Sequence, residues 1–222
     1  MRKTILQTGE YYHLYNRGVD KRKVFLSTSD YERFLLSMKE FNDQEAHGGI
    51  RLNYFRKKSE KTVRGLAPNS LGTKPLTEFV CYCLLDNHFH FLIKQSVDRG
   101  ISEFMKRLLG GYTCYFNQKY KRSGSLFQGT FKAVHVADEN YLWYLSAYIH
   151  GNPEIHKLGQ AENYKWSSYG DYLSGRTNSF CHLKNDVLKE FSGISEYRDF
   201  VKETIANSSE VKEELKKLDD LL

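Results

Sequence analysis

Residues 80–93 read VCYCLLDNHFHFLI, and this stretch decides the fold. Its two halves are rich in β-branched, aromatic and aliphatic residues, which favours two strands. Asp86-Asn87 between them is typical of a tight turn. We therefore predict a hairpin with strands over residues 78–85 and 88–95.

The second predicted strand begins with His88 and His90, separated by one residue. Because side chains alternate between the two faces of a strand, both imidazoles point the same way. Such a pair suits a divalent cation. The alternative is two core histidines that hydrogen-bond to their neighbours.

A zinc site is a second alternative, because a two-residue turn places Cys83 opposite His90 and puts Cys81 on the same face. A flat strand spreads successive same-face side chains by about 7 Å, which is too wide for four ligands around one ion. No cysteine lies in a C-x-x-C pair, and we expect all 4 to be reduced thiols.

The composition is that of a globular protein, and its basic charge and aromatic residues match what nucleic-acid binding uses, although an ordinary core and a solvated surface explain them as well. The 222 residues suit one main domain, and no apolar stretch approaches the roughly 20 residues of a membrane helix. The N-terminus lacks the apolar core of an export signal, so we expect a cytoplasmic protein with no membrane partner. The net charge of +6, with 16 Tyr and 14 Phe, supplies cations for phosphates and rings for bases.

Alternating residues predict a further strand over 11–17, and Ser29-Asp30 caps a predicted helix that runs to Phe41. A second helix is expected from Gly100 to about Tyr120, with Gly110-Gly111 interrupting it. A short strand over 131–136 follows.

Asp138 then caps a helix that we expect Asn152-Pro153 to stop. The resulting order of elements predicts an α+β fold, an antiparallel sheet with helices on one face. We assign residues 8–155 to this domain, with a basic insertion at about 48–76, and 156–222 to a mostly helical C-terminal extension. The last helix is predicted from about Ser195 to Leu222.

Tyr148 and Asn152 lie one turn apart on one face of the helix that begins after Asp138. They offer a phenol and an amide oxygen to the histidine strand, which gives a nucleophile beside a third metal ligand. The rival nucleophiles Tyr112, Tyr115 and Tyr120 have no metal-capable residue one turn later, so we interpret them as core or DNA-stacking residues.

The chain resembles the single-tyrosine HUH transposases, in particular the REP-associated tyrosine transposase branch. Five blocks occur in the order typical of that family: residues 12–18 (YHLYNRG), 87–92 (NHFHFL), 122–129 (RSGSLFQG), 148–153 (YIHGNP) and 166–169 (WSSY). The resemblance covers roughly residues 10–170 and implies a ferredoxin-like domain. It implies a transposase that cuts single-stranded DNA and keeps the 5′ end as a phosphotyrosine.

By this resemblance, Tyr148 is the nucleophile and His88, His90 and Asn152 hold the metal, Mg²⁺ or Mn²⁺. The chain has Asn152 where relatives often have glutamine, and Thr130 where they usually have arginine, for which Lys132 can substitute. The expected partner is single-stranded DNA with a hairpin, bound by a monomer or homodimer at the nucleoid. We expect DNA contacts from Arg17, Lys106, Arg107, Lys121, Arg122 and Lys132. The alternative function is a non-catalytic ferredoxin-like module that binds nucleic acid.

Overall fold

The computed structural model describes residues 4–45, 74–174 and 180–208. Within them the strands are β1 (Tyr11–Arg17), β2 (Thr77–Leu84), β3 (His88–Gln95) and β4 (Lys132–Val136). The longer helices are α1 (Thr28–Phe41), α3 (Gly100–Lys119), α4 (Glu139–Ile155) and α7 (Ile194–Ala206). Shorter helical segments are η1 (Val19–Lys21), η2 (Ala161–Asn163), α5 (Tyr169–Leu173) and α6 (Asn185–Leu188).

The strands form one antiparallel sheet in the order β2-β3-β1-β4. Helix α1 connects β1 to β2, and α3 connects β3 to β4, which is the ferredoxin-like connectivity. The predicted α+β class and the predicted hairpin are therefore confirmed. Within the hairpin Cys83 pairs with His90, as a two-residue turn requires.

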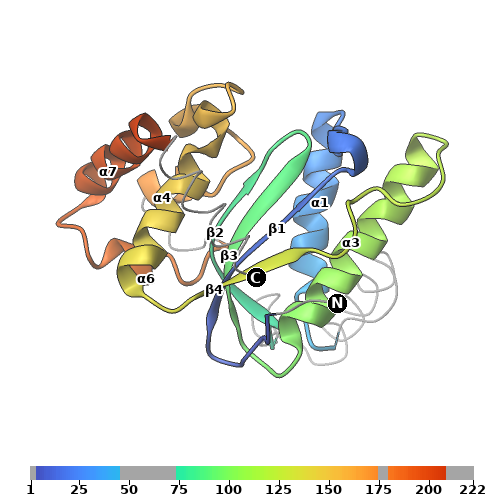
Figure 1. Cartoon of the computed structure of the whole chain (residues 1–222), viewed down its shortest axis with the longest axis horizontal. Helices are drawn as coiled ribbons and strands as arrows, with labels where there is room; N and C mark the ends of the chain where they lie inside the picture. Colours follow the sequence, from blue (N-terminus) through green and yellow to red (C-terminus); the bar gives the residue numbers. More distant parts are fainter. Residues whose placement is uncertain (1–3, 46–73, 175–179, 209–222) are drawn as a thin grey trace, which may run out of the picture.

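Helices cover both faces of this sheet, so the prediction of helices on one face is wrong. Figure 1 shows α1 and α3 on one side of the sheet and α4, α6 and α7 on the other. From β3, Phe89 and Phe91 enter the core beside α1 and α3, whereas Leu92 enters the core beside α4 and α7. The near-continuous apolar run at residues 79–85 is typical of a strand covered on both faces.

Two predicted interruptions of helices do not occur. Helix α3 runs through Gly110 and Gly111 without a break. A Cβ at Gly111 would lie 2.8 Å from the Phe41 ring, so this glycine allows α1 and α3 to approach closely. Helix α4 begins as predicted, with Tyr141 N donating to Asp138 Oδ1. It continues past Pro153 to Ile155, since a proline in the last turn removes a single backbone hydrogen bond.

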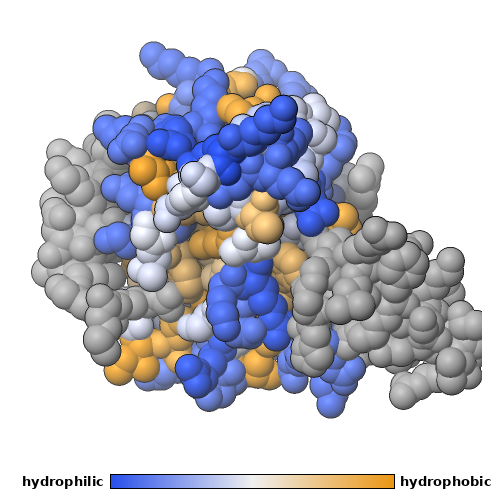
Figure 2. Space-filling model, turned by 90° about the vertical axis from the view of Figure 1, so that its right-hand side faces the viewer, coloured by the Kyte–Doolittle hydropathy of each residue, from blue (hydrophilic) through white to orange (hydrophobic). Residues whose placement is uncertain are grey.

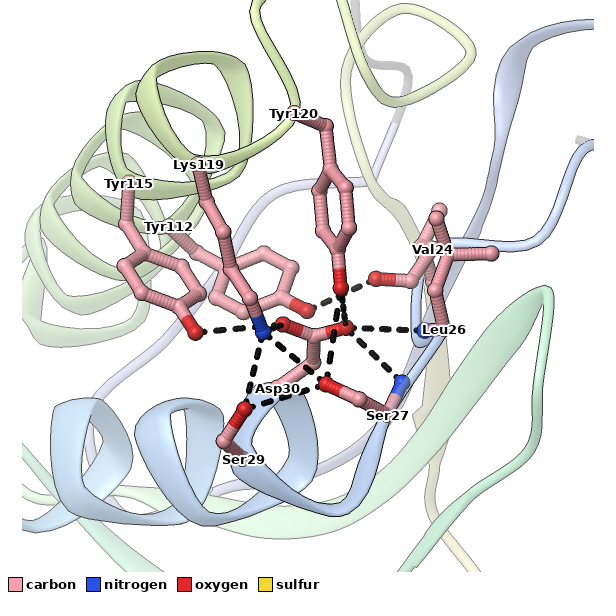
Figure 3. Close-up of polar contacts among 9 residues, drawn as sticks. All are labelled: Val24, Leu26, Ser27, Ser29, Asp30, Tyr112, Tyr115, Lys119 and Tyr120. Atoms are coloured by element: carbon pink, nitrogen blue, oxygen red, sulfur yellow. Dashed lines mark hydrogen bonds and ion pairs between the residues drawn. The ribbon is translucent and has the colours of Figure 1, made fainter.

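A polar cluster joins the start of α1 to the end of α3 (Figure 3). Asp30 is fully buried and accepts hydrogen bonds from Lys119 Nζ at 2.6 Å and Tyr120 Oη at 2.7 Å. It also accepts from Tyr115 Oη at 3.1 Å and from the backbone N–H of Leu26 at 2.9 Å. The carboxylate therefore fixes the relative position of two helices on the face opposite α4.

The first part of the C-terminal extension packs against α4. Tyr197 and Val201 of α7 are buried in the same core as α4. A Cβ at Gly151 would lie 2.7 Å from Ile205 Cγ1, so the glycine brings the two helices close. Most of the basic insertion and the predicted helix beyond residue 208 lie outside the described residues. Within the described part, no helix is both long and apolar enough to cross a membrane.

Candidate active site

The predicted site lies on the sheet face that α4 covers. Strand β1 pairs with β3 so that Arg17 is opposite His88 and Tyr15 is opposite His90. Since directly paired residues of antiparallel strands point to the same face, these four side chains share one surface. His13 lies on it too, two residues before Tyr15.

Each predicted histidine ligand has its Nδ1 held by a hydrogen bond. His88 Nδ1 lies 2.5 Å from Asn87 Oδ1, and His90 Nδ1 lies 2.8 Å from Nε2 of His13. In the tautomer in which each Nδ1 carries the hydrogen, both Nε2 lone pairs stay free for a ligand. Metal-binding histidines are typically oriented by such a bond from the second ring nitrogen.

The environment keeps these histidines neutral. Burial, together with nearby His156 and Arg17, lowers the pKa of His88 to about 3. Burial also lowers the pKa of His90 well below its usual value, with His13 and His88 adding to the effect. The pKa of His13 falls to about 3 for the same reason, burial. Neutral imidazole is the form that binds a metal ion.

The end of helix α4 lies against His88 and His90, and it presents residues that are spaced one helical turn apart. The Tyr148 ring stands edge-on to His90, with 6.1 Å between ring centroids, and His156 stands edge-on to His88 at 4.9 Å. Asn152 lies midway between Tyr148 and His156 on the same helical face, so it faces the region between the two histidines.

The side-chain oxygen of Asn152 is buried and makes no hydrogen bond among the described residues. The residue is fully buried, and its Nδ2 donates to the backbone oxygen of Tyr148 at 2.9 Å. Its Oδ1 has no hydrogen-bond partner among the described residues. An unpaired buried polar atom costs about 1–3 kcal/mol, and a cation would relieve that cost.

Tyr148 is itself 5% exposed, and burial raises the pKa of its phenol to about 12, with Tyr144 and Cys83 adding to the effect. The hydroxyl is therefore protonated at neutral pH. A phenol in this state attacks poorly, so the site must supply a cation or a strongly activated electrophile.

Among the described residues, no group of three or more His, Cys, Asp or Glu side chains is arranged to hold a metal ion. The predicted ligand set is different, since it combines two histidines with an amide. The zinc alternative has no such group to support it. Burial raises the pKa of the Cys81 and Cys83 thiols, so that both are neutral in this structure.

Comparison with known proteins agrees with this architecture. Residues 50–152 match the family model described as "Transposase IS200 like", and the match ends at Asn152. This part of the chain is therefore similar to IS200-like transposases. The fold is similar to a solved structure described as "Structure of the REP associates tyrosine transposase bound to a REP hairpin". The TM-score is 0.51 at 12% identity, over 82% of this chain and 89% of that one. No curated protein matches the chain significantly.

The three rival tyrosines make contacts away from the candidate site. Tyr112 Oη donates to the backbone oxygen of Val24 at 2.7 Å. Tyr115 and Tyr120 both donate to Asp30 (Figure 3). All three belong to α3 or its end, which lies across the sheet from α4. Their interpretation as core residues fits these contacts.

The predicted DNA-binding cations separate into two groups. Arg17 lies beside His88, with its Nε buried and without a hydrogen-bond partner among the described residues. Lys132 is exposed and pairs with Tyr15 across β1 and β4. The other four lie on α3 or just after it, away from the site: Lys106, Arg107, Lys121 and Arg122. Of these, Arg107 binds Glu103 and the Asp43 backbone, and Arg122 binds Asn117 and Ser125.

The sequence interpretation did not assign roles to two histidines that contact the site, His13 and His156. His156 follows Asn152 by one turn, so the helical period could have found it, but the expected end of the helix at Pro153 excluded it. His13 lies within a predicted strand. Its contact with His90 depends on which strands are neighbours, which the alternation of side chains does not reveal.

Proposed function

We propose that this chain is a metal-dependent single-stranded DNA endonuclease and strand transferase that acts through a 5′-phosphotyrosine on Tyr148. The observation that carries the proposal is the meeting of α4 and β3. Tyr148 packs against His90, and the unpaired Oδ1 of Asn152 lies on the helical face that meets both histidines. A non-catalytic binding module does not require a tyrosine and an unpaired amide oxygen beside two neutral histidines.

The residues fit a divalent cation. Nε2 of His88, Nε2 of His90 and Oδ1 of Asn152 would hold it, with Mg²⁺ favoured by oxygen ligands and Mn²⁺ by imidazoles. When bound, the ion neutralises the scissile phosphate and makes its phosphorus a better electrophile.

In the proposed reaction the Tyr148 oxygen forms a bond to phosphorus and loses its proton. The bond from phosphorus to the 3′ oxygen of the preceding nucleotide breaks, and that oxygen takes up a proton. Arg17, beside His88, supplies a fixed positive charge for the phosphate. The phosphotyrosine retains the energy of the broken bond, so a 3′ hydroxyl can reverse the step without ATP.

The proposed substrate is single-stranded DNA that carries a hairpin, in line with the hairpin named for the structurally similar transposase. Transposition or the processing of repeat hairpins is the proposed role. A cytoplasmic location at the nucleoid and a monomeric or homodimeric state stay predictions.

A labelled hairpin oligonucleotide with a single-stranded extension tests the proposal. With Mn²⁺, a 3′-labelled strand should stay with the protein through SDS denaturation, and a 5′-labelled strand should give a shorter free fragment. EDTA and Tyr148→Phe should each abolish the adduct, whereas Tyr115→Phe should keep it. A binding module would retard the DNA without any SDS-resistant adduct, and that result would overturn the proposal.

A further inference from the structure

The loop after β1 is fastened to the turn that precedes His88. Gly18 N donates to Asn87 O at 2.8 Å, and Asn87 Nδ2 donates to Lys21 O at 3.1 Å. The backbone N–H groups of Val24 and Phe25 both donate to Asp86 O. This loop therefore has a fixed position at the end of the sheet where the site begins.

Three successive cations on this loop face solvent. Lys21, Arg22 and Lys23 are all exposed. Arg22 lies 3.4 Å from Asp20 and Lys23 lies 3.2 Å from Asp86. Exposed ion pairs of this kind contribute about 0–1 kcal/mol, so a phosphate can replace the carboxylate at little cost. Figure 2 shows hydrophilic residues gathered over this upper end of the molecule on its α1 and α3 side.

A column of aromatic rings rises from the core beside this loop. Phe25 is buried and stacks on Tyr31 with 4.4 Å between centroids, and Tyr31 stacks on Trp166 at 4.5 Å with an angle of 8°. Trp166 is held in place because its backbone oxygen accepts from Leu84 N at the end of β2. The column thus ends on a half-buried tryptophan attached to the hairpin.

A lysine side chain lies over the second face of Trp166. Since Tyr31 occupies one face of the indole, the ammonium of Lys165, 4.7 Å from the ring centroid, lies over the other. Lys165 is exposed, and a cation on an exposed ring contributes about 0.5–1 kcal/mol. A nucleobase in the same place would continue the stack and is worth about 1–3 kcal/mol.

We propose that Trp166, backed by Tyr31, is a stacking site for an unpaired base of single-stranded DNA. Lys165 and the cations at 21–23 bind the phosphates on either side of that base. The proposal rests on the proposed function, because it supplies the path by which the strand reaches His88. It assigns the partner by chemistry: an exposed ring face recognises a base, and clustered cations recognise phosphates.

The chain has 2 tryptophans, which makes the test direct. Trp143→Phe leaves Trp166 as the one tryptophan, whose emission is excited selectively at a wavelength that tyrosine does not absorb. The protein is titrated with an oligothymidylate in EDTA, where no cleavage occurs. The expected result is saturable quenching of Trp166 emission that weakens with salt. The reciprocal variant Trp166→Phe, which keeps a ring in the column, should bind with little quenching of Trp143. A blunt duplex should not quench Trp166, because its bases are already paired.

Affinity supplies the second measurement. Trp166→Ala should weaken binding of the oligothymidylate about tenfold, and Arg22→Ala should weaken it and reduce its dependence on salt. Lys202→Ala removes an exposed cation from α7 and should change neither the affinity nor its dependence on salt.

Unchanged Trp166 emission at oligonucleotide concentrations that saturate the anisotropy of a labelled strand would overturn the proposal, as would absence of binding at low salt. The two proposals fail separately. Quenching without a covalent adduct in the cleavage assay would support the stacking site at Trp166 and contradict the proposed nuclease activity. An adduct without quenching would support the nuclease activity and contradict the stacking site.

Discussion

Asn152 is the residue on which the metal proposal depends most. Its Oδ1 is buried without a partner among the described residues, while its Nδ2 is anchored to its own helix. Asn152→Ala removes the oxygen and should lower Mn²⁺ affinity at least about tenfold, measured by electron paramagnetic resonance in the absence of DNA. Asn163→Ala, an exposed asparagine of η2, is the control. Equal affinity in both variants would remove Asn152 from the ligand set.

His13 acts on the site through His90. The 2.8 Å bond between them couples the tautomers of the two rings, and a His90 that donates from Nδ1 keeps Nε2 free for a metal ion. His13→Ala should therefore weaken Mn²⁺ binding about 10–100-fold, and nitrogen NMR of His90 should show a mixture of tautomers. His135→Ala, at an exposed site on β4, should change neither property. A His13→Ala protein with native metal affinity would show that the contact is only structural.

At this scale the sequence could single out the paired histidines, the tyrosine and the asparagine as candidates because each pattern is local. Two residues on a strand or four on a helix fix a common face. That β3 and α4 pack together was a hypothesis from the residue types, which the family resemblance supported, because neither local pattern fixes which elements are neighbours. The contact of His13 with His90 needed the strand order, which is a property of the whole sheet.

The cluster around Asp30 connects α1 and α3 and should make stability depend on pH. Burial alone would raise the pKa of Asp30, but hydrogen bonds from Lys119, Tyr120, Leu26 and Tyr115 lower it overall from 3.8. The stabilisation is present above that value and is lost as the pH falls through the lower pKa of the folded state.

Asp30→Asn should lower the free energy of unfolding by about 2 kcal/mol at neutral pH, measured by urea denaturation. The difference from the native protein should shrink as the pH falls below the ordinary carboxyl pKa of 3.8. Asp199→Asn, in an exposed ion pair on α7, should cost less than about 0.5 kcal/mol. A constant difference across the pH range would contradict the role given to the carboxylate.

A second buried network attaches α4 to the C-terminal extension. His150 lies between Tyr148 and Asn152 in sequence and is fully buried. Its Nδ1 is 2.7 Å from Tyr197 Oη of α7, and its Nε2 is 2.9 Å from Ser168 Oγ. Helix α7 thus helps to hold the helix that bears the proposed nucleophile.

Tyr197→Phe removes one partner of His150 and should cost about 1–3 kcal/mol, seen as a lower thermal midpoint. Tyr169→Phe is a matched control, because its buried hydroxyl has no hydrogen-bond partner among the described residues. It should cost less than the change at Tyr197. Equal losses in the two variants would mean that ring packing, and not the hydrogen bond, joins α7 to α4.

For the whole molecule, the order of elements was predictable because each strand and helix has its own residue period. The second helical layer was missed, although the apolar run at 79–85 indicates a strand covered on both faces. The role of the C-terminal helices was also missed, because their contact with α4 joins residues far apart in the chain. The two layers place the proposed site between the sheet and α4 rather than on an open sheet face.

The central claim is that Tyr148 forms the covalent bond to DNA. Mass spectrometry of the SDS-resistant adduct, after nuclease trimming and trypsin digestion, tests it most directly. The tryptic peptide 133–157 contains Tyr141, Tyr144 and Tyr148, so fragmentation can distinguish them. The expected result is a phosphonucleotide on Tyr148 alone. A phosphonucleotide on Tyr144, on Tyr115 or on any other residue would contradict the account.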